Sequence, residues 1–403
     1  MDQASALMLQ RYFREYYFKR ADNIKAPSEI ASREFGYFPF GGGMIRHLSF
    51  NEVGTLRALL VREAPAGVYC SNSLYQDPTA EMQKKEWIRA EPIFDIDADA
   101  LKLPCKRAHD VWRCKDCGRS EFGIRPLTCP TCKGNKLLEF TWSCPTCLEG
   151  TKKETFKLLE FLEQDFGISS SEISVYFSGN AGYHIQISGS RLDRLDQHGR
   201  SEIADYLTGT GVMLSNFENS KLSPTDPGWR GRIARYIRDI PVGTPPFKTN
   251  ELKKRVLEIE NDLKPAQIEE ILNSAVSSNA IRIDAMVTAD IHRIFRMPET
   301  LNNKTGLVKK RCANLSTFDP SVEPIALPEE QDLVSLEVDM CPEIRLGGVK
   351  FGPIRHELNV KVPIFLAVYL IARNAAKITL PNQSTVVSPA ALRGNSEKIS
   401  STN

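Results

Sequence analysis

The segment Glu91-Pro92-Ile93-Phe94-Asp95-Ile96-Asp97-Ala98-Asp99 alternates apolar and acidic residues with a period of two. A β-strand with this pattern places the carboxylates of Asp95 and Asp97 on one face, with Cα atoms roughly 6–7 Å apart. Two carboxylates this close repel each other unless one is protonated or a hard divalent cation lies between them. For an arbitrary Asp-x-Asp pair, a charged edge strand is the commoner explanation. The rest of the chain has to decide between these two interpretations.

The composition is that of an ordinary globular chain, with 403 residues of which 41% are hydrophobic. This length predicts one large domain with insertions, or two domains. Lys and Arg total 52 against 50 Asp and Glu, which gives a net charge of +2. The charge balance alone therefore indicates no polyanionic partner, and any basic surface must be local.

Neither a targeting signal nor a membrane span is expected. Met1 to Asn23 lacks the continuous apolar core of a secretory signal and carries charges throughout. The longest apolar run, Val362 to Ala372, is too short to cross a bilayer. We therefore expect a soluble, cytoplasmic protein that makes no membrane contact.

Eight candidate metal ligands follow the acidic stretch. Three Cys-x-x-Cys pairs, with eleven residues between successive pairs, come after two further candidates; in order the eight are Cys105, His109, Cys114, Cys117, Cys129, Cys132, Cys144 and Cys147. Each pair forms a tight turn whose thiolates can share one tetrahedral zinc ion. In a chain without an export signal, such pairs indicate metal binding rather than disulfides. Eight ligands predict two zinc sites.

The spacing favours one partition of these ligands into sites. Cys114, Cys117, Cys129 and Cys132 would form a zinc ribbon inserted into a second site made by Cys105, His109, Cys144 and Cys147. Other partitions of the pairs remain open at this point. Four protein ligands leave no coordination position for a substrate, so we expect both zinc ions to be structural.

A short turn between two predicted strands is a candidate phosphate-binding element. Ile173–Phe177 and Tyr183–Ser188 have strand patterns and enclose Ser178-Gly179-Asn180-Ala181-Gly182. Two glycines in five residues let backbone amides approach an anion closely, and Ser178 and His184 add hydrogen-bond donors. Most glycine-containing hairpins are only turns, so the weight of this one depends on its neighbours.

A third acid comes late in the chain. Ile281 to Thr288 alternates again and predicts a strand from which Asp284 projects, and cations follow, among them Arg296 and Lys304. Three carboxylates beside cations are what metal-assisted nucleotidyl transfer requires. The acids hold two Mg²⁺ ions about 4 Å apart, and the cations offset the charge of a triphosphate.

The remaining patterns predict the frame around these motifs. Helices are expected over 4–21, 51–64, 152–166 and 363–376, an extended segment over 68–75, and a hairpin over 33–47 that carries Arg46. Residues 248–278 predict two charged helices broken near Pro265. The stretch Trp229–Arg238 interleaves arginines with aromatic residues, which suits nucleic acid but equally a solvated helical face.

Taken together, these motifs resemble the catalytic small subunit of archaeal and eukaryotic DNA primases, in the archaeal style. The resemblance rests on segments spread over nearly the whole chain, which in order are Arg33-Glu-Phe35, Arg46-His47, Asp95-x-Asp97, the Cys/His cluster with Cys144-Pro-Thr-Cys147-Leu, Ser178-Gly-x-x-Gly-x-His184, Arg282-Ile-Asp284 through Lys304-Thr-Gly306, and Leu346 to Ala376. It implies a mixed α/β primase fold with a zinc module beside the active site, and template-directed primer synthesis from nucleoside triphosphates.

Carried over by position, the resemblance implies roles for individual residues. Asp95, Asp97 and Asp284 would be the catalytic carboxylates that bind Mg²⁺ or Mn²⁺. The nucleotide-binding residues would be Ser178, Gly179, His184, Arg296, Lys304 and Arg46. The chain departs from the family in having Asn180 and Ala181 where many relatives have an arginine, and in carrying a second zinc-ligand set beyond the usual one.

The implied organisation is a catalytic core with insertions. We assign 1–104 to the first part of the core, 105–150 to the zinc module with its inserted ribbon, 151–383 to the remainder of the core with a helical insertion at about 248–279, and 384–403 to a disordered tail. The implied partners are a large regulatory primase subunit in a heterodimer, a single-stranded DNA template and nucleoside triphosphates.

Two alternatives to a replicative primase stay open. A related polymerase acting in end joining or damage tolerance would share the acids and the Ser-Gly-His turn. A non-enzymatic zinc-ribbon scaffold that binds nucleic acid would explain the cysteines only. The sequence leaves undecided the choice between ribo- and deoxynucleotides, because one or two contacts govern it, and also the choice between Mg²⁺ and Mn²⁺, the primer length and the role of the ribbon.

Overall fold

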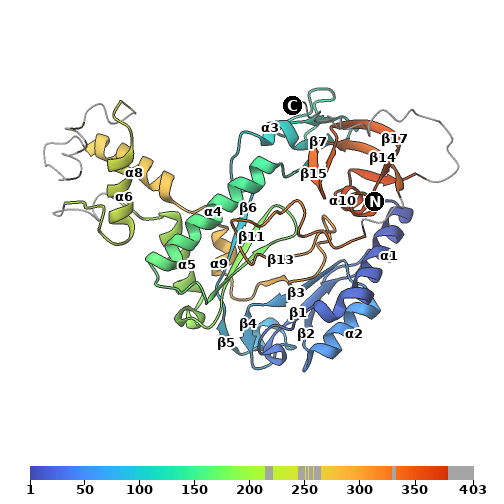
Figure 1. Cartoon of the computed structure of the whole chain (residues 1–403), viewed down its shortest axis with the longest axis horizontal. Helices are drawn as coiled ribbons and strands as arrows, with labels where there is room; N and C mark the ends of the chain where they lie inside the picture. Colours follow the sequence, from blue (N-terminus) through green and yellow to red (C-terminus); the bar gives the residue numbers. More distant parts are fainter. Residues whose placement is uncertain are drawn as a thin grey trace, which may run out of the picture.

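The computed structural model describes residues 1–213, 221–243, 250, 253, 257, 265–328 and 333–379 (Figure 1). Its described helices are α1 (Gln3–Arg20), α2 (Val53–Glu63), α3 (Lys106–His109), α4 (Pro145–Gln164), α5 (Gln197–Thr208), α6 (Gly228–Asp239), α8 (Pro265–Asn279), α9 (Ala285–Ala289) and α10 (Ile364–Ala372). Short 3₁₀ turns are η1 (Ala21–Asn23), η2 (Ile30–Ser32), η3 (Met82–Lys84) and η4 (Arg191–Arg194). The helices predicted over 4–21 and 51–64 are confirmed by α1 and α2, and the one predicted over 152–166 begins earlier, at Pro145.

The strands of the described residues form six antiparallel sheets, which confirms the predicted mixed α/β class. The central sheet has the order β13 (Lys310–Arg311), β10 (Ile173–Phe177), β11 (Gly182–Ile187), β6 (Ile93–Asp97), and a second four-stranded sheet has the order β12 (Ile294–Arg296), β3 (Gly67–Ser71), β1 (Phe35–Phe38), β2 (Ile45–Leu48). The smaller sheets are β17 (Ile354–Val362), β14 (Val334–Cys341), β18 (Ala376–Ile378); β15 (Ile344–Leu346), β16 (Val349–Phe351); β4 (Ser73–Tyr75), β5 (Trp87–Ala90); and β8 (Ser120–Phe122), β7 (Val111–Cys114), β9 (Leu137–Phe140).

Alternation along β6 decides which face of the central sheet is buried. Phe94 and Ile96 are fully buried and share a core with Leu158, Phe161 and Leu162 of α4. These three α4 residues recur at helical spacing, so one side of α4 covers the sheet. Because successive strand residues point to opposite faces, the acids of β6 project from the face opposite α4, where Ile93 packs against Val287 and Phe295.

The segment around the third acid folds differently from its prediction. Residues 281–288 were expected to form a strand, but Asp284 instead caps the short helix α9. Its side chain accepts hydrogen bonds from the amides of Met286, at 3.1 Å, and Val287, at 3.2 Å. Aspartate is a preferred N-cap residue because it satisfies these otherwise free donors, and this local preference outweighs a short apolar alternation.

Helix α10 is the most apolar helix of the C-terminal part, and its residues Ile364 to Ile371 are buried. It ends at Ala372, earlier than predicted, because Ala376–Ile378 adds the strand β18 to the sheet of β14. Within the described ranges, no helix is both long and apolar enough to traverse a bilayer. The apolar run therefore belongs to the core of the protein.

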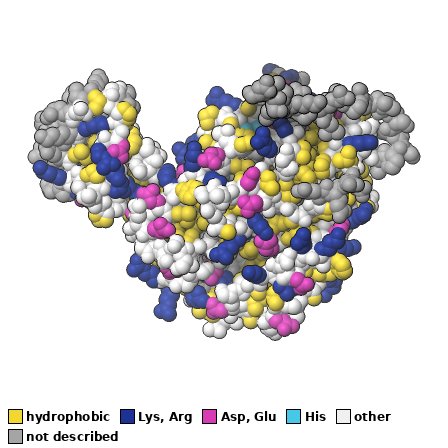
Figure 2. Space-filling model, viewed as in Figure 1, with side chains coloured by type: hydrophobic (Ala, Val, Ile, Leu, Met, Phe, Trp, Pro, Cys, Tyr) yellow, Lys and Arg dark blue, Asp and Glu magenta, His cyan; other side chains and the backbone are white. Residues whose placement is uncertain are grey.

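A lobe that carries α6 and α8 stands off the main body and is joined to it at one side (Figures 1 and 2). Within α6, Trp229 is buried, and the buried Arg232 pairs with Asp165 at 3.1 Å and lies over the ring of Phe161. The inner part of the basic stretch thus anchors the lobe, while Arg238 is half-exposed at its end. Helix α8 starts at the predicted break near Pro265; most of the preceding predicted helix, and the tail from 384, lie outside the described residues.

Candidate active site

Asp97 and Asp284 are both neighbours of Asp95 at the end of the central sheet. Asp95 and Asp97 project from the same face of β6, and the backbone amide of Asp284 donates a 3.1 Å hydrogen bond to the carbonyl of Asp95. Burial, with the charges of Asp97 and Asp284, raises the pKa of Asp95 to about 7. Burial and the charge of Asp99 raise the pKa of Asp97 as well. A divalent cation would remove this repulsion, so the donor set fits a hard metal ion.

His184 lies directly opposite Asp95 in the register of β11 and β6. Its Nε2 atom is 3.6 Å from Asp95 Oδ1, and its ring contacts the ring of Phe295 edge to face. Burial and the positive charge of Lys309 hold the pKa of His184 well below its usual range, so the imidazole is neutral at physiological pH. Its buried Nδ1 has no hydrogen-bond partner among the described residues. An orphaned buried nitrogen indicates that a ligand completes this site.

The two glycines of the turn are required by close packing. Gly182 lies so near the acidic strand that an added Cβ would be 1.9 Å from the carbonyl oxygen of Ile96. Gly179 has a φ of +78°, and an added Cβ would be 3.0 Å from the carbonyl oxygen of Leu307. Only glycine tolerates such approaches. The turn is therefore wedged between the acidic strand on one side and the 301–308 loop on the other.

Hydrogen bonds fix the turn to the loop that carries Lys304. The side-chain amide of Asn302 donates to the carbonyl of Ser178 at 3.4 Å, and the Thr305 hydroxyl donates to the carbonyl of Gly179. Lys304 itself is exposed, and its charge opposes the rise in the pKa of Asp97. Acids, turn and exposed lysine thus form one group, although their residues are distant in sequence.

The two expected arginines already have partners in the structure. Arg46 forms a two-pronged ion pair with the buried Glu34, at 2.9 and 3.1 Å. Arg296 donates to the carbonyl of Leu301 at 3.1 Å and to the hydroxyl of Tyr69 at 3.0 Å. Both guanidinium groups are therefore already paired, whereas the exposed Lys304 side chain has no hydrogen-bond or ion-pair partner among the described residues.

Lys309 is a cation of this site that the sequence did not single out. It is 2% exposed, donates to the carbonyl of Arg296 at 2.8 Å and lies over the ring of Tyr176. Burial and the charge of Arg296 lower its pKa to about 7. Its only sequence signal is its place at the start of a short cationic run behind Leu307 and Val308, which gives no hint of burial.

A cavity of about 1000 Å³ lies between the central sheet and the second sheet. Tyr176 and Gln186 line it from the central sheet, Phe295 and Cys70 from the second, and Lys309 at its edge. Its lining includes Arg296 but none of the three acids, His184 or the 178–182 turn, so the cavity lies beside the candidate catalytic group and does not contain it. On the face visible in Figure 2, acidic and basic side chains are interspersed, so no single charge dominates there.

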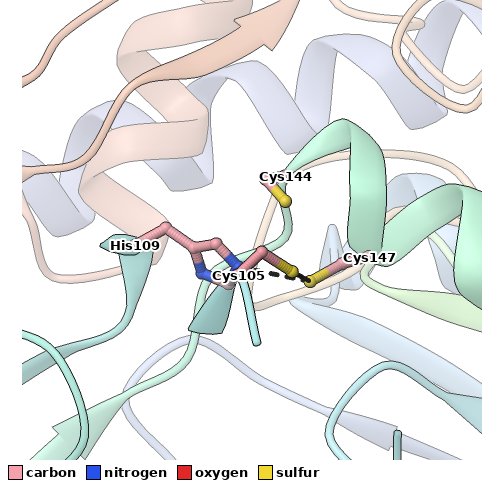
Figure 3. Close-up of side chains that lie close together, drawn as sticks. All are labelled: Cys105, His109, Cys144 and Cys147. Carbon is pink, nitrogen blue, oxygen red and sulfur yellow. Dashed lines mark hydrogen bonds between the residues drawn. The ribbon is translucent and has the colours of Figure 1, made fainter. Parts of the chain in front are cut away.

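The first cysteine–histidine set lies beside the active-site turn. Cys105, His109, Cys144 and Cys147 place their ligand atoms within 4.8 Å of one another, and the four side chains converge in Figure 3. Nδ1 of His109 hydrogen-bonds Asp110 at 3.0 Å, which leaves Nε2 facing the cysteines, 3.2 Å from the sulfur of Cys147. A carboxylate behind a histidine in this way is typical of zinc sites.

The second set, Cys114, Cys117, Cys129 and Cys132, also gathers within 4.8 Å. Its sulfur pairs Cys114–Cys132 and Cys117–Cys129 are 3.5 and 3.7 Å apart. Zinc–sulfur bonds of about 2.3 Å in a tetrahedron require sulfurs about 3.8 Å apart. The partition favoured by the spacing is the one in the structure, and both donor sets fit structural zinc.

The family model for the DNA primase small subunit matches residues 141–312. The chain is 37% identical over 384 residues to the DNA primase small subunit PriS of Cenarchaeum symbiosum, covering 93% of this chain and 99% of that protein. It is 34% identical to the PriS of Nitrosopumilus maritimus, covering 94% and 100%, and 33% identical to that of Thermoplasma acidophilum, covering 90% and 98%.

Proposed function

This chain belongs to the family of archaeal-type DNA primase small subunits, and on that premise we propose that Asp95, Asp97 and Asp284 are its catalytic metal ligands. The protein is the catalytic subunit of a DNA primase, a nucleotidyltransferase of DNA replication. The proposal concerns how its residues perform that reaction. It is carried by one observation: burial and the charges of the neighbouring Asp97 and Asp284 raise the pKa of Asp95 to about 7.

The reaction is the template-directed joining of nucleoside triphosphates into short primers on single-stranded DNA. Mg²⁺ or Mn²⁺ bound by the acids would lower the pKa of the attacking 3′-hydroxyl and neutralise the departing pyrophosphate. Asp95 and Asp97 are oriented by the strand pairing of β6 with β11, and Asp284 by its N-cap bonds and its amide bond to Asp95. The acids are therefore held in place before substrate arrives, which favours catalysis.

The triphosphate would be bound by the turn and its neighbours. Neutral His184 donates one N–H, Ser178 offers its hydroxyl and Gly179 its amide, while Lys304 supplies an exposed positive charge. Lys309, whose pKa is lowered to about 7, would add a buried positive charge in its protonated form. For Arg46 and Arg296, contact with substrate requires an exchange of their present partners.

We also propose the remaining components. Zn²⁺ fills both tetrads and stabilises the module that flanks the turn. A large regulatory primase subunit and a single-stranded DNA template are the partners. The alternative of a non-enzymatic scaffold is wrong for a primase catalytic subunit, and similarity to primase small subunits over more than nine-tenths of the chain argues against a specialised repair polymerase.

The deciding experiment is primer synthesis on an unprimed single-stranded template. Wild type is compared with the Asp95→Ala/Asp97→Ala double variant, with NTPs or dNTPs supplied separately and with Mg²⁺ or Mn²⁺. De novo products from wild type alone support the proposal and identify the sugar that is used. Equal synthesis by the double variant would refute the assignment of the acids, and no synthesis by wild type, even with a large subunit added, would refute the reaction.

A further inference from the structure

Arg373 lies at the end of α10 and reaches the apex of the active-site turn. One of its terminal nitrogens donates to Asn180 Oδ1 at 2.8 Å, and the other donates to the carbonyl of Thr141 at 2.9 Å. Thr141 leads into the zinc ligand Cys144, and α10 belongs to the C-terminal segment. One guanidinium therefore joins the zinc module, the turn and the C-terminal helix.

Aromatic packing fixes the plane of this guanidinium. Its carbon lies 5.1 Å from the ring centre of Trp142 and 4.8 Å from that of Tyr369, and both rings are buried. Arginine stacks on aromatic faces while its fork of donors remains available. The stacking alone would attach α10 to the zinc module, so the bond to Asn180 is an additional, directional contact.

Other residues of the active-site turn are fixed by contacts of their own, so the side chain of Asn180 is the part of the turn that depends on Arg373. The Ala98 amide donates to the carbonyl of Ala181 at 3.2 Å, and Ala181 packs against Cys147. The Asn180 amide bonds the hydroxyl of Ser178 at 3.3 Å. Within the described parts of the chain, the bond from Arg373 is the one hydrogen bond made by the Asn180 side chain.

A parallel contact ties the acidic strand to the same threonine. The hydroxyl of Thr141 donates to Asp99 at 3.1 Å, and Lys106 pairs with Asp99 at 2.7 Å. Thr141 thus contacts the turn that follows the acidic strand β6 through its side chain and Arg373 through its carbonyl. Contacts made by the zinc module therefore help to fix the distance between the acids and the active-site turn, together with the strand pairing of the central sheet.

We propose that Arg373 is a positioning residue for nucleotide binding, which holds Asn180 so that the turn keeps its triphosphate-binding geometry. This rests on the proposed function, in which the turn binds the triphosphate. Arg373 contacts neither the acids nor His184, so it acts on the binding of the nucleotide through the turn and leaves the chemical step unchanged. Its loss therefore raises KM for the nucleotide and spares kcat.

The test compares Arg373→Gln with a matched control, Arg355→Gln. Arg355 also joins the C-terminal part to the zinc module, since it pairs with Glu121 at 2.6 Å and lies over the ring of Phe122, but it does not touch the turn. Primer extension is measured against nucleotide concentration, and nucleotide affinity is measured separately by fluorescence titration. Zinc content and melting temperature report folding.

We expect KM and the nucleotide Kd to rise about tenfold or more in Arg373→Gln, with kcat within about threefold of wild type, and neither to change in Arg355→Gln. Asn180→Ala should reproduce the effect, and the double variant should add nothing further, because both changes remove one contact. Arg373→Lys, which keeps the charge but not the fork, should stay impaired.

Three outcomes would overturn the proposal: an unchanged KM in folded Arg373→Gln, an additive double variant, or an equal loss in Arg355→Gln. If Arg373→Gln does not fold, Asn180→Ala decides alone, because it leaves the stacking on Trp142 and Tyr369 intact. A wild-type protein that binds no nucleotide would instead count against the proposed function. The two failures are therefore distinguishable.

Discussion

Asp95 and His184 face each other across β6 and β11, with Oδ1 and Nε2 3.6 Å apart, yet at neutral pH they do not form an ordinary ion pair. Burial raises the pKa of the acid to about 7 and lowers that of the imidazole well below its usual range. Both groups are thereby driven toward their neutral forms. A cation bound at the site would favour the ionised form of Asp95 instead, and this relationship has measurable consequences.

The first prediction concerns stability against pH without added Mg²⁺ or Mn²⁺. Between about pH 4, the unfolded pKa of an aspartate, and pH 7, folded Asp95 retains a proton that the unfolded chain has released. Stability therefore falls as pH rises through this window, by at most about 4 kcal/mol for a shift of about three pKa units. Urea unfolding of wild type and of Asp95→Asn measures the difference between the two curves.

The Asp95→Asn variant should gain on wild type from pH 4 to pH 7 and then stay level, and Mg²⁺ at pH 8 should close the gap. Subtracting the two curves removes the titration of all other groups. A difference that does not vary with pH would show that Asp95 ionises normally. A gap that Mg²⁺ leaves unchanged would show that the acids do not bind it.

The second prediction is that Asp97→Ala removes catalysis and leaves the fold intact. Loss of a metal ligand should lower the rate of nucleotide incorporation by at least about a thousandfold, since metal assistance is worth several kcal/mol. Because Asp97 has a raised pKa, its removal costs the folded state little. Primer synthesis and zinc content are measured on the same sample, and near-wild-type synthesis would contradict the assignment.

The third prediction compares a glycine that close packing requires with a glycine that has open space around it. Gly182→Ala places a Cβ 1.9 Å from the Ile96 carbonyl, so the strand pairing must shift. We expect a loss of about 3 kcal/mol or more in stability, comparable to other severe steric changes. Gly43→Ala is the control, because a Cβ there meets no atom within 4 Å. Thermal melting of both variants tests the idea, which fails if they melt together.

The fourth prediction concerns the order in which the two metal sites are lost. Cys117 and Cys132 are exposed, whereas His109 and Cys147 are buried, so a chelator should remove zinc from the second set first. Cys117→Ser/Cys132→Ser should bind one zinc equivalent and keep most of its thermal stability. Cys144→Ser/Cys147→Ser should destabilise the protein more, because Cys147 packs against Ala181 of the turn. Simultaneous release of both ions would contradict this order.

The features that depend on only a few neighbouring residues, such as the acidic strand and the zinc sites, could be predicted from local sequence patterns. The alternation at 93–97 and the cysteine spacing sufficed because strand period and zinc geometry are both properties of a few adjacent residues. The alternation over Ile281 to Thr288 predicts a strand at Asp284, since a short apolar alternation cannot be told from a helix start without knowing which amides need a cap. Its grouping with Asp95 was implied by the resemblance to primase small subunits.

Groups whose importance depends on burial or distant contacts could not be predicted. Lys309 looks like a surface lysine in the sequence but is enclosed between two sheets. Arg373 follows an apolar helix and shows no sign of its bond to Asn180, because the partners lie 193 positions apart. The sequence suggests that Arg46 is available for substrate, whereas in the structure it forms an ion pair with the buried carboxylate of Glu34.

The amide bond from Asp284 to Asp95 also bears on how such a chain can change over evolutionary time. Asp95 and Asp284 are linked by this hydrogen bond at the central sheet. The ribbon of Cys114–Cys132 and the lobe of α6 and α8 lie between these two acids in the sequence and extend outward from the sheet. These two inserted segments can lengthen, shorten or be exchanged between lineages without displacing the carboxylates. Length variation among homologues should therefore concentrate in these two segments, and chimaeras that swap them should remain competent for synthesis.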